Sequence, residues 1–426
     1  MIGGVPSPAL VERTATPGAR GLATRYSGDN RVPYRGGMSS RLLLPALLGA
    51  ITVVSATQSA APPAPPVSCA AVTAANADDC LRLNHLQVLG THNSYHLAPA
   101  APILAALGDR APALDYTHQP LPVQLERLGI RQLEIDVYAD PSGGRYSTPA
   151  MLRTTPGLER LVPGPALRAP GFKVLHVPDV DFHVTCPTLV ACLTEVRDWS
   201  RAHPRHVPIL VMLELKDEPR DDPRHIGLVQ PLPIDGPALD ALDAEIRSVF
   251  DETHLLTPDD VRGSRATLRE ALEKDGWPRL RDARGKVLFA MDNTDAHRAA
   301  YLDGHPTLER RVLFVSADPG SPASAFLKMN DALGAEGRRI RARVAETYIV
   351  RTRADEPGKE ARTGDTRRRD AAFATGAQFV STDYPEPSPF GTGYLARLPG
   401  AASLPARCNP VTAPPGCRDA WLEALR

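Results

Sequence analysis

Short apolar runs alternate with longer amphipathic stretches along most of this chain. Eight of the runs indicate strands, and they cover residues 86–91, 131–137, 172–177, 207–215, 286–291, 311–316, 346–351 and 377–382. Between them, apolar positions recur every three or four residues, as in 188–202 and 237–250, which is the spacing of helices. Strands that alternate with helices indicate a parallel sheet, and eight of them predict a closed (β/α)8 barrel, a single α/β domain.

The rest of the pattern adds detail to this barrel. The long connection 216–285 must hold more than one helix, and Thr257 before Pro258 reads as a fresh helix start. Residues 352–370 are highly charged with both signs, which favours a solvated loop leading into a helix over a phosphate-binding face. A short helix is expected at 418–425.

A segment typical of secretory signals follows residue 37. Met38 begins a short basic region, residues 42–54 form an apolar run too short for an ordinary membrane span, and small residues follow at 55–61. We therefore expect translation to start at Met38 and the chain to be exported. The alternative is a disordered cytoplasmic extension ahead of an uncleaved anchor. The expected parts are a mis-assigned extension, a signal peptide, an Ala/Pro linker with the first cysteine pair, the barrel, and a disulfide-pinned tail, at 1–37, 38–61, 62–80, 81–390 and 391–426.

Several side chains with chemical potential stand at the ends of the predicted strands. In chain order they are His92, Asn93, Glu134, Asp136, His176, Glu214 and Lys216. In barrels of this type the pocket is built by the loops that follow the strands, so these residues are expected at one mouth. Two carboxylates at i and i+2 on a strand point to the same side, and they repel each other unless a cation lies between them.

The oxygen-rich set at these positions favours calcium. Asn93, Glu134, Asp136 and Glu214 offer four oxygen ligands, three of them anionic, and calcium accepts six to eight oxygens in irregular geometry. Zinc would require more nitrogen or sulfur. The competing explanation is ion pairing with inward-facing arginines, which accounts for one glutamate more easily than for all three carboxylates.

The order HN, ExD, H, ExK on successive strands resembles the calcium-dependent phosphoinositide-specific phospholipases C, within them the secreted bacterial branch. The resemblance runs from about Leu81 to Pro385. It implies the phospholipase C-like phosphodiesterase type of TIM barrel with a calcium ion. It also implies that His92 donates to the phosphoryl oxygens and that His176 protonates the leaving group. Calcium would lower the pKa of a coordinated hydroxyl, and a carboxylate ligand such as Glu134 is the expected acceptor of its proton.

Further residues are weaker candidates for substrate binding. Lys216 would give a fixed positive charge to a phosphate, with a salt bridge to Glu214 an equally good explanation. Arg351 and Arg353, at the end of the seventh strand, are phosphate candidates, and Tyr384 is a candidate to stack on an inositol face.

Charge and cysteine content narrow the class of protein. With 49 basic and 49 acidic residues the formal net charge is zero, so nothing favours nucleic acid as a partner. The six cysteines lack zinc-site spacing and fall into three close pairs, for which local disulfides suit an oxidising compartment. Buried free thiols are the alternative. The expected pairs are Cys69–Cys80, Cys186–Cys192 and Cys408–Cys417.

These observations together predict a secreted, calcium-dependent phospholipase C that cleaves phosphatidylinositol at a membrane surface, acting as a monomer. The chain has no GxSxG, HExxH, Walker A or GxGxxG motif, which argues against serine hydrolase, zincin and nucleotide chemistry. The alternatives are another metal-dependent phosphodiesterase on the same barrel, acting on glycerophosphodiesters or sphingophospholipids, and a non-catalytic secreted lipid-binding barrel.

Overall fold

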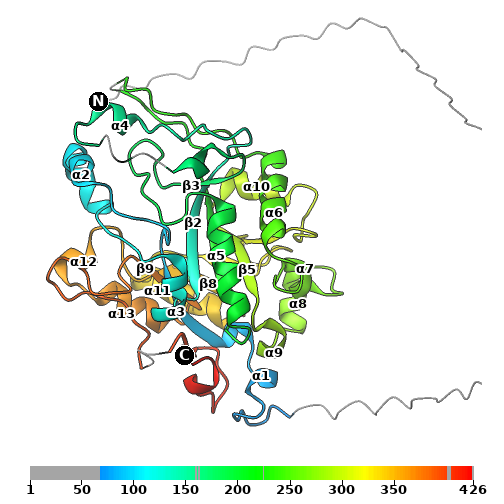
Figure 1. The fold of residues 1–426 in the computed structure, drawn as a ribbon. Helices are drawn as coiled ribbons and strands as arrows, with labels where there is room; N and C mark the ends of the chain where they lie inside the picture. The colour runs from blue at the N-terminus through cyan, green and yellow to red at the C-terminus, as the bar shows by residue number, and fades with distance from the viewer. Residues whose placement is uncertain (1–67, 159–160, 162–163, 224, 401–403, 425–426) are drawn as a thin grey trace, which may run out of the picture. The chain divides into compact units, whose positions relative to one another are not determined.

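The structure is a computed structural model that describes residues 68–158, 161, 164–223, 225–400 and 404–424 (Figure 1). The expected extension and signal peptide, and the linker before residue 68, lie outside the described residues. Within the described part of the chain, no helix combines the length and the apolar character that crossing a bilayer requires.

Eight parallel strands form the barrel. They are β1 (Leu86–Thr91), β2 (Gln132–Tyr138), β4 (Ile209–Leu215), β5 (Val287–Met291), β6 (Leu313–Val315), β7 (Phe326–Lys328), β8 (Ile349–Arg353) and β9 (Phe379–Thr382). Hydrogen bonds connect them in the order β6-β5-β4-β2-β1-β9-β8-β7, and a parallel bridge between Ser316 and Phe326 joins β6 to β7. The predicted (β/α)8 barrel is confirmed.

One predicted barrel strand is wrong and one was missed. Residues 172–177 contain only the two-residue β3 (Lys173–Val174), which lies antiparallel to the end of β2 and outside the barrel order. The third strand along the chain in the barrel is β4, and the missing member is β7. With three residues, β7 is too short for its apolar alternation to stand out in the sequence.

Helices of the described residues lie between the strands in sequence. They are α1 (Ala77–Cys80), α2 (Ala101–Leu107), α3 (Leu121–Arg127), α4 (Ala150–Thr154), α5 (Leu189–Ala202), α6 (Gly236–Val249), α7 (Pro258–Arg262), α8 (Leu268–Lys274), α9 (Leu280–Ala283), α10 (Asp295–Leu302), α11 (Gly334–Ala345), α12 (Glu360–Thr363) and α13 (Arg367–Thr375). The expected helices at 188–202 and 237–250 are α5 and α6, which lie alongside the strands in Figure 1.

Capping side chains explain where several helices begin. The Thr188 hydroxyl accepts the backbone N–H of Ala191 at the start of α5. Thr257 and Asp260 form a reciprocal capping box at the start of α7, as the sequence predicted for a fresh helix there. The expected helix at 418–425 is shorter, a single 3-10 turn at Asp419–Trp421.

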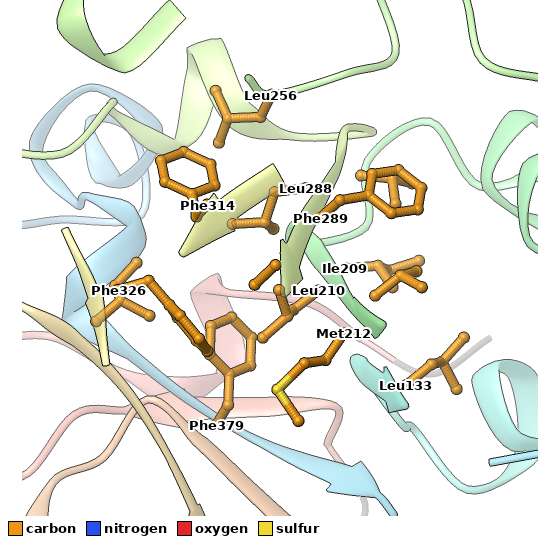
Figure 2. Close-up of a cluster of buried hydrophobic side chains, with 14 of the residues drawn as sticks. Leu133, Ile209, Leu210, Met212, Leu256, Leu288, Phe289, Phe314, Phe326 and Phe379 are labelled. Atoms are coloured by element: carbon orange, nitrogen blue, oxygen red, sulfur yellow. The ribbon is translucent and has the colours of Figure 1, made fainter. Parts of the chain in front are cut away.

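The amino-terminal half of the barrel interior is apolar. Paired residues on parallel strands share a face, and Leu210 pairs with Leu288 while Phe326 pairs with Ile349. Figure 2 shows this cluster, in which Leu210, Leu288 and Phe326 meet Phe379. Each such side chain contributes about 1.5–3 kcal/mol when it leaves water. The polar side chains nearer the carboxyl ends of the strands therefore lie directly above a packed apolar layer.

The three expected disulfides are present. They join Cys69 to Cys80, Cys186 to Cys192, and Cys408 to Cys417. Cys408 of the last pair is the final residue of β10 (Ala406–Cys408). This strand pairs antiparallel with β1 and so joins the carboxyl-terminal tail to the barrel.

Candidate active site

Strand register brings the predicted carboxylates to one end of the barrel. Glu134 and Asp136 alternate with outward residues on β2, so both face inward with Gln132. Asp136 is directly paired with Glu214, the penultimate residue of β4. The next inward position along that strand direction is Lys216. The i, i+2 spacing therefore places these four side chains at the carboxyl end of the barrel, as predicted.

The neighbouring strands bring cations and a histidine to the same end. Arg351 on β8 pairs with Phe379 of the core, and Arg353 pairs with Ser381, so both arginines face inward. Gly90 on β1 also pairs with Ser381, which makes His92 the next inward position. A side chain at position 90 would collide with Gln132, because its Cβ would lie 1.9 Å from the Gln132 Oε1 atom.

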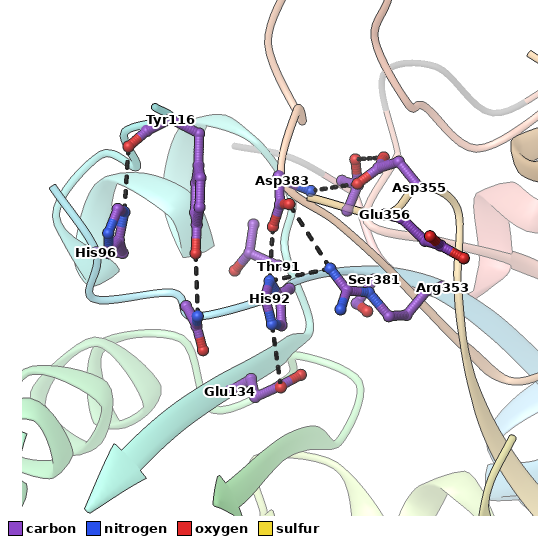
Figure 3. A network of polar contacts seen from close by, with 12 residues as sticks. Thr91, His92, His96, Tyr116, Glu134, Arg353, Asp355, Glu356, Ser381 and Asp383 are labelled. Atoms are coloured by element: carbon purple, nitrogen blue, oxygen red, sulfur yellow. Dashed lines mark hydrogen bonds and ion pairs between the residues drawn. The ribbon is translucent and has the colours of Figure 1, made fainter. Parts of the chain in front are cut away.

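His92 is held by a carboxylate that the sequence analysis did not single out. Its Nδ1 atom lies 2.8 Å from Asp383 Oδ1, and its Nε2 atom lies 3.8 Å from Glu134 Oε1 (Figure 3). Arg353 lies close to both His92 and Asp383, with a terminal nitrogen 3.1 Å from His92 Nδ1 and 3.6 Å from Asp383 Oδ2. Burial, with the Arg353 guanidinium, lowers the pKa of His92 to about 3. Nδ1 therefore faces one group that can only accept, Asp383, and one that can only donate, Arg353. Asp383 is the nearer, so we assign the Nδ1–H of a neutral His92 to Asp383 and the lone pair to Nε2.

Asn93 has the strained backbone and the free oxygen of a ligand-binding residue. Its φ is 44°, a left-handed conformation that asparagine tolerates better than most residues. Its Nδ2 donates to the Tyr116 hydroxyl at 3.0 Å. The opposite oxygen, Oδ1, is buried and has no hydrogen-bond partner among the described residues. An orphaned buried acceptor of this kind is costly unless a cation or water binds it.

Glu134 is buried and paired with an arginine. Its Oε2 accepts a short hydrogen bond from Arg351, whose other terminal nitrogen donates to Asn330. Burial raises the pKa of Glu134 to about 8, although the Arg351 guanidinium acts in the opposite direction. The ion pairing with an inward arginine that the sequence left open is therefore found at Glu134.

Asp136 and Glu214 share one ammonium group. The Lys216 Nζ atom lies 2.8 Å from Glu214 Oε1 and 3.3 Å from Asp136 Oδ2. Asp136 is fully buried, and burial raises its pKa well above the ordinary value. Within the described ranges, neither of its oxygens has a hydrogen-bond partner of normal geometry. For Glu214 burial acts in the opposite direction, but the Lys216 ammonium holds its pKa below the ordinary value.

The donor set at this end of the barrel suits a calcium ion in its chemistry, although the donor atoms of its three carboxylates do not all lie within 4.8 Å of one another. Asn93, Glu134, Asp136 and Glu214 supply only oxygen atoms, which is the chemistry that calcium selects. The buried Asn93 Oδ1 and both Asp136 oxygens have no hydrogen-bond partner of normal geometry, although the Lys216 ammonium lies 3.3 Å from Asp136 Oδ2. Glu134 is bonded to Arg351 and Glu214 to Lys216, so these two cations balance part of the negative charge of the carboxylates.

His176 lies on the loop after β3 and faces a cavity. Its Nδ1 atom is 2.7 Å from Asp181 Oδ2, and its side chain is 21% exposed. Its backbone carbonyl accepts the Tyr138 hydroxyl at 3.0 Å. Together with Tyr138, Lys216 and Arg220, His176 lines a cavity of about 500 Å³. Both predicted histidines thus bond a carboxylate through Nδ1.

The candidate Tyr384 and a histidine outside the predicted set, His118, lie at the edge of this arrangement. Tyr384 is 4% exposed and packs with Tyr116, Ala361 and Tyr394, so its ring offers no open face for stacking. His118 is buried with its Nε2 atom 2.8 Å from the His92 carbonyl oxygen, so it supports the backbone of the site.

Sequence reasoning missed the acidic partners of the two histidines. Asp383 directly follows β9, and it sits two residues after the inward Ser381, so strand alternation was a signal for it. Asp181 lies on an irregular loop, where no periodicity marks it.

The fold and these side chains define a barrel hydrolase of the phospholipase C-like phosphodiesterase class. The family model for phosphoinositide phospholipase C, Ca²⁺-dependent, matches residues 81–410. The chain belongs to this family, whose members are phosphoric diester hydrolases that depend on calcium.

Solved structures similar to this chain were also found, at low identity. A calcium-dependent phosphoinositol-specific phospholipase C from Pseudomonas sp. in its apo form has 17% identity, and the match covers 78% of this chain and 96% of that one with a TM-score of 0.46. A Ca²⁺-dependent phosphatidylinositol-specific phospholipase C from Streptomyces antibioticus has 19% identity, 72% and 95% coverage and a TM-score of 0.44. The search of curated proteins gave no match. Membership in the family rests on the family model alone.

Proposed function

We propose that this chain cleaves the phosphodiester of phosphatidylinositol to diacylglycerol and an inositol phosphate, through attack by a ring hydroxyl. One observation carries the proposal. His92 and His176 each bond a carboxylate through Nδ1 and leave Nε2 for a substrate, at the end of the barrel where the carboxylates gather. Internal attack on a phosphodiester needs a base for the hydroxyl and an acid for the leaving oxygen, which are the two roles that such histidines perform.

Asn93, Glu134, Asp136 and Glu214 would hold the calcium ion. Bound there, calcium would lower the pKa of a coordinated hydroxyl and neutralise charge on the phosphate. The unpartnered Asn93 and Asp136 oxygens support this ligand set.

The protons are assigned to the two histidine Nε2 atoms. Because the Nδ1–H of His92 donates a hydrogen bond to Asp383 and burial keeps the ring neutral, its Nε2 lone pair accepts the proton of the attacking hydroxyl. We prefer this role to donation by His92, and to Glu134 as the base, since Glu134 already accepts from Arg351. His176 Nε2 protonates the glycerol oxygen as it leaves.

The cationic side chains would bind the phosphate. Arg353 lies beside His92, and Lys216 lines the cavity next to His176, so both lie within the region that the phosphodiester would occupy. Arg351 is 1% exposed and bonded to Glu134, so it would act on the phosphate only after that contact rearranges.

The test is to incubate the purified protein with phosphatidylinositol, phosphatidylcholine and glycerophosphoinositol, with calcium or with excess chelator, and to identify products by phosphorus NMR. We expect cleavage of phosphatidylinositol in calcium and none in chelator, with His92→Ala and His176→Ala strongly impaired. Cleavage of glycerophosphoinositol or phosphatidylcholine in preference to phosphatidylinositol would favour the other phosphodiesterases. No cleavage of any of the three would favour a lipid-binding barrel.

We also propose that the protein is exported. The three disulfides are typical of an oxidising compartment. The amino-terminal residue of the protein recovered from culture medium should follow the small residues at 55–61. Protein found only inside the cell, with free thiols, would overturn this part of the proposal.

A further inference from the structure

A third histidine is bonded to the carboxylate that holds His176. His96, on the loop after β1, lies with its Nε2 atom 2.7 Å from Asp181 Oδ2, the same oxygen that lies 2.7 Å from His176 Nδ1. The side chains of His96 and Asp181 are both 0% exposed. The two imidazole rings meet edge to face, with centroids 5.7 Å apart.

The other ring nitrogen of His96 fixes where its proton lies. His96 Nδ1 is 3.1 Å from the backbone carbonyl oxygen of Tyr116, which can only accept, so Nδ1 carries a proton (Figure 3). A neutral His96 would then point an Nε2 lone pair at a carboxylate oxygen. A second proton must therefore lie between His96 and Asp181. We assign this proton to His96 Nε2, because Asp181 Oδ2 lies 2.7 Å from both rings, the geometry of a carboxylate oxygen that accepts two charge-assisted hydrogen bonds. His96 is then the imidazolium of a buried ion pair.

A metal ion does not explain the cluster as well. Among the described residues, His96, His176 and Asp181 are the one group of histidine, cysteine and acidic side chains whose donor atoms all lie within 4.8 Å of one another. Two ligands of a tetrahedral zinc ion lie roughly 3.3 Å apart, given bonds of about 2.0 Å. The observed 2.7 Å separations from one shared oxygen are those of charge-assisted hydrogen bonds.

The cluster is also locked to the rest of the site. The Tyr116 ring stacks on His96 with centroids 4.2 Å apart and an interplanar angle of 23°. The hydroxyl of the same tyrosine accepts from Asn93, and the His96 backbone N–H donates to the Asn93 carbonyl at 2.9 Å. His96 therefore has little rotational freedom, and the carboxylate that it holds has a fixed position.

We infer that Asp181 and His96 are positioning residues for His176. The buried ion pair fixes the Asp181 oxygen that accepts His176 Nδ1–H, which sets the His176 tautomer and turns Nε2 toward the cavity. The positive charge of His96 also balances the negative charge of Asp181, so His176 does not lie beside an uncompensated carboxylate. This inference deepens the proposed function, since it assumes that His176 is the acid for the leaving group.

The test compares two substrates in three variants. These are phosphatidylinositol and an analogue in which sulfur replaces the leaving glycerol oxygen, because a thiolate departs without a proton. His176→Ala is the reference, with an expected loss of roughly 10²–10⁴-fold in kcat on the natural lipid and a much smaller loss on the sulfur analogue. Asp181→Asn and His96→Gln should follow the same pattern with smaller losses, roughly 10–100-fold and with little change in KM, as for loss of an orienting group. His206→Gln, a buried histidine bonded to Ser200 away from the site, is the control and should leave both activities unchanged.

Nitrogen NMR of histidine-labelled protein at neutral pH gives a readout that mere loss of stability would not produce. In the wild type, both ring nitrogens of His96 and Nδ1 of His176 should carry protons, and Asp181→Asn should remove the Nδ1 preference of His176. Equal losses on both substrates in Asp181→Asn, or a neutral His96 in the wild type, would overturn the inference. If His176→Ala itself shows no dependence on the leaving group, the proposed role of His176 fails, while the NMR result still decides whether Asp181 and His96 position the ring.

Discussion

Replacing Lys216 with methionine tests whether its ammonium serves mainly as the counterion of the predicted calcium ligands. In the structure this group lies between Glu214 and Asp136, at 2.8 and 3.3 Å. A divalent cation bound by the same carboxylates would take over its electrostatic role. We therefore expect Lys216→Met to destabilise the protein in chelator and to strengthen its binding of calcium.

The size of the effect follows from these distances. At an effective dielectric constant of about 20, each contact is worth about 5–6 kcal/mol of raw attraction. Most of it is offset by the desolvation of the buried Asp136 and the partly buried Glu214 and Lys216. Removing one partner of a buried ion pair costs about 3–5 kcal/mol. Protonation of Asp136, whose pKa burial already raises, limits that cost. We expect the free energy of unfolding to fall by about 2–3 kcal/mol in chelator and by less than about 1 kcal/mol in saturating calcium.

The assay is urea unfolding in chelator and in calcium, with calcium affinity measured by calorimetry. The dissociation constant of calcium should fall about tenfold in Lys216→Met, which corresponds to about 1.4 kcal/mol. Lys173→Met is the control, because Lys173 is a buried lysine on β3, outside the barrel order, whose ammonium lies 3.3 Å from Asp140. Its loss of stability should be the same with and without calcium. Equal losses in both conditions for Lys216→Met, with unchanged calcium affinity, would refute the counterion role.

Three shorter predictions follow from the same structure. Glu134→Gln removes one negative charge from the calcium ligands, so the calcium affinity measured by calorimetry should fall. Magnesium should not restore the activity of this variant, since magnesium demands a stricter octahedral shell. His92→Ala should lower kcat roughly 10²–10⁴-fold on the natural lipid and on the sulfur analogue alike, because the attacking hydroxyl must lose its proton whatever leaves. Burial lowers the pKa of His206 from 6.5 to about 4, so its contribution to stability is full above pH 6.5 and is lost as the pH falls toward 4. Unfolding free energies should show about 2 kcal/mol of this loss at pH 5 in the wild type and not in His206→Gln.

Much of the fold was predictable because long strands and helices repeat their pattern. Strands β4 and β9 and helix α5 fall within the predicted ranges, and α6 begins one residue before its range. Each of them buries a full stripe or face. The segment 172–177 misled because four of its six residues are apolar, as in a barrel strand. Only two of its residues form a strand, which pairs antiparallel with the end of β2 outside the barrel order. β7 is buried but too short to be distinguished from a loop.

The candidate site was predictable where it lies on strands. The i, i+2 spacing of Glu134 and Asp136 fixed a shared face, and the structure confirms that they face inward together. The loops are different, because the position of a loop residue depends on long-range contacts that leave no local pattern. His96 and Asp181 are 85 residues apart in the sequence, and nothing near either one indicates that they share a proton.

On the last barrel strand, β9, the alternation of inward and outward side chains predicts which of the residues after the strand faces the site. Phe379 and Ser381 face the barrel interior, as their pairing with Arg351 and Arg353 requires. The same alternation places Asp383 inward and Tyr384 outward. The sequence analysis selected Tyr384 for its chemistry, and the structure buries it among aromatic side chains while Asp383 holds His92. Alternation is a stronger physical constraint than residue type. A candidate at a strand end should therefore first lie an even number of positions after an inward-facing residue of that strand, and only then be judged by its chemistry.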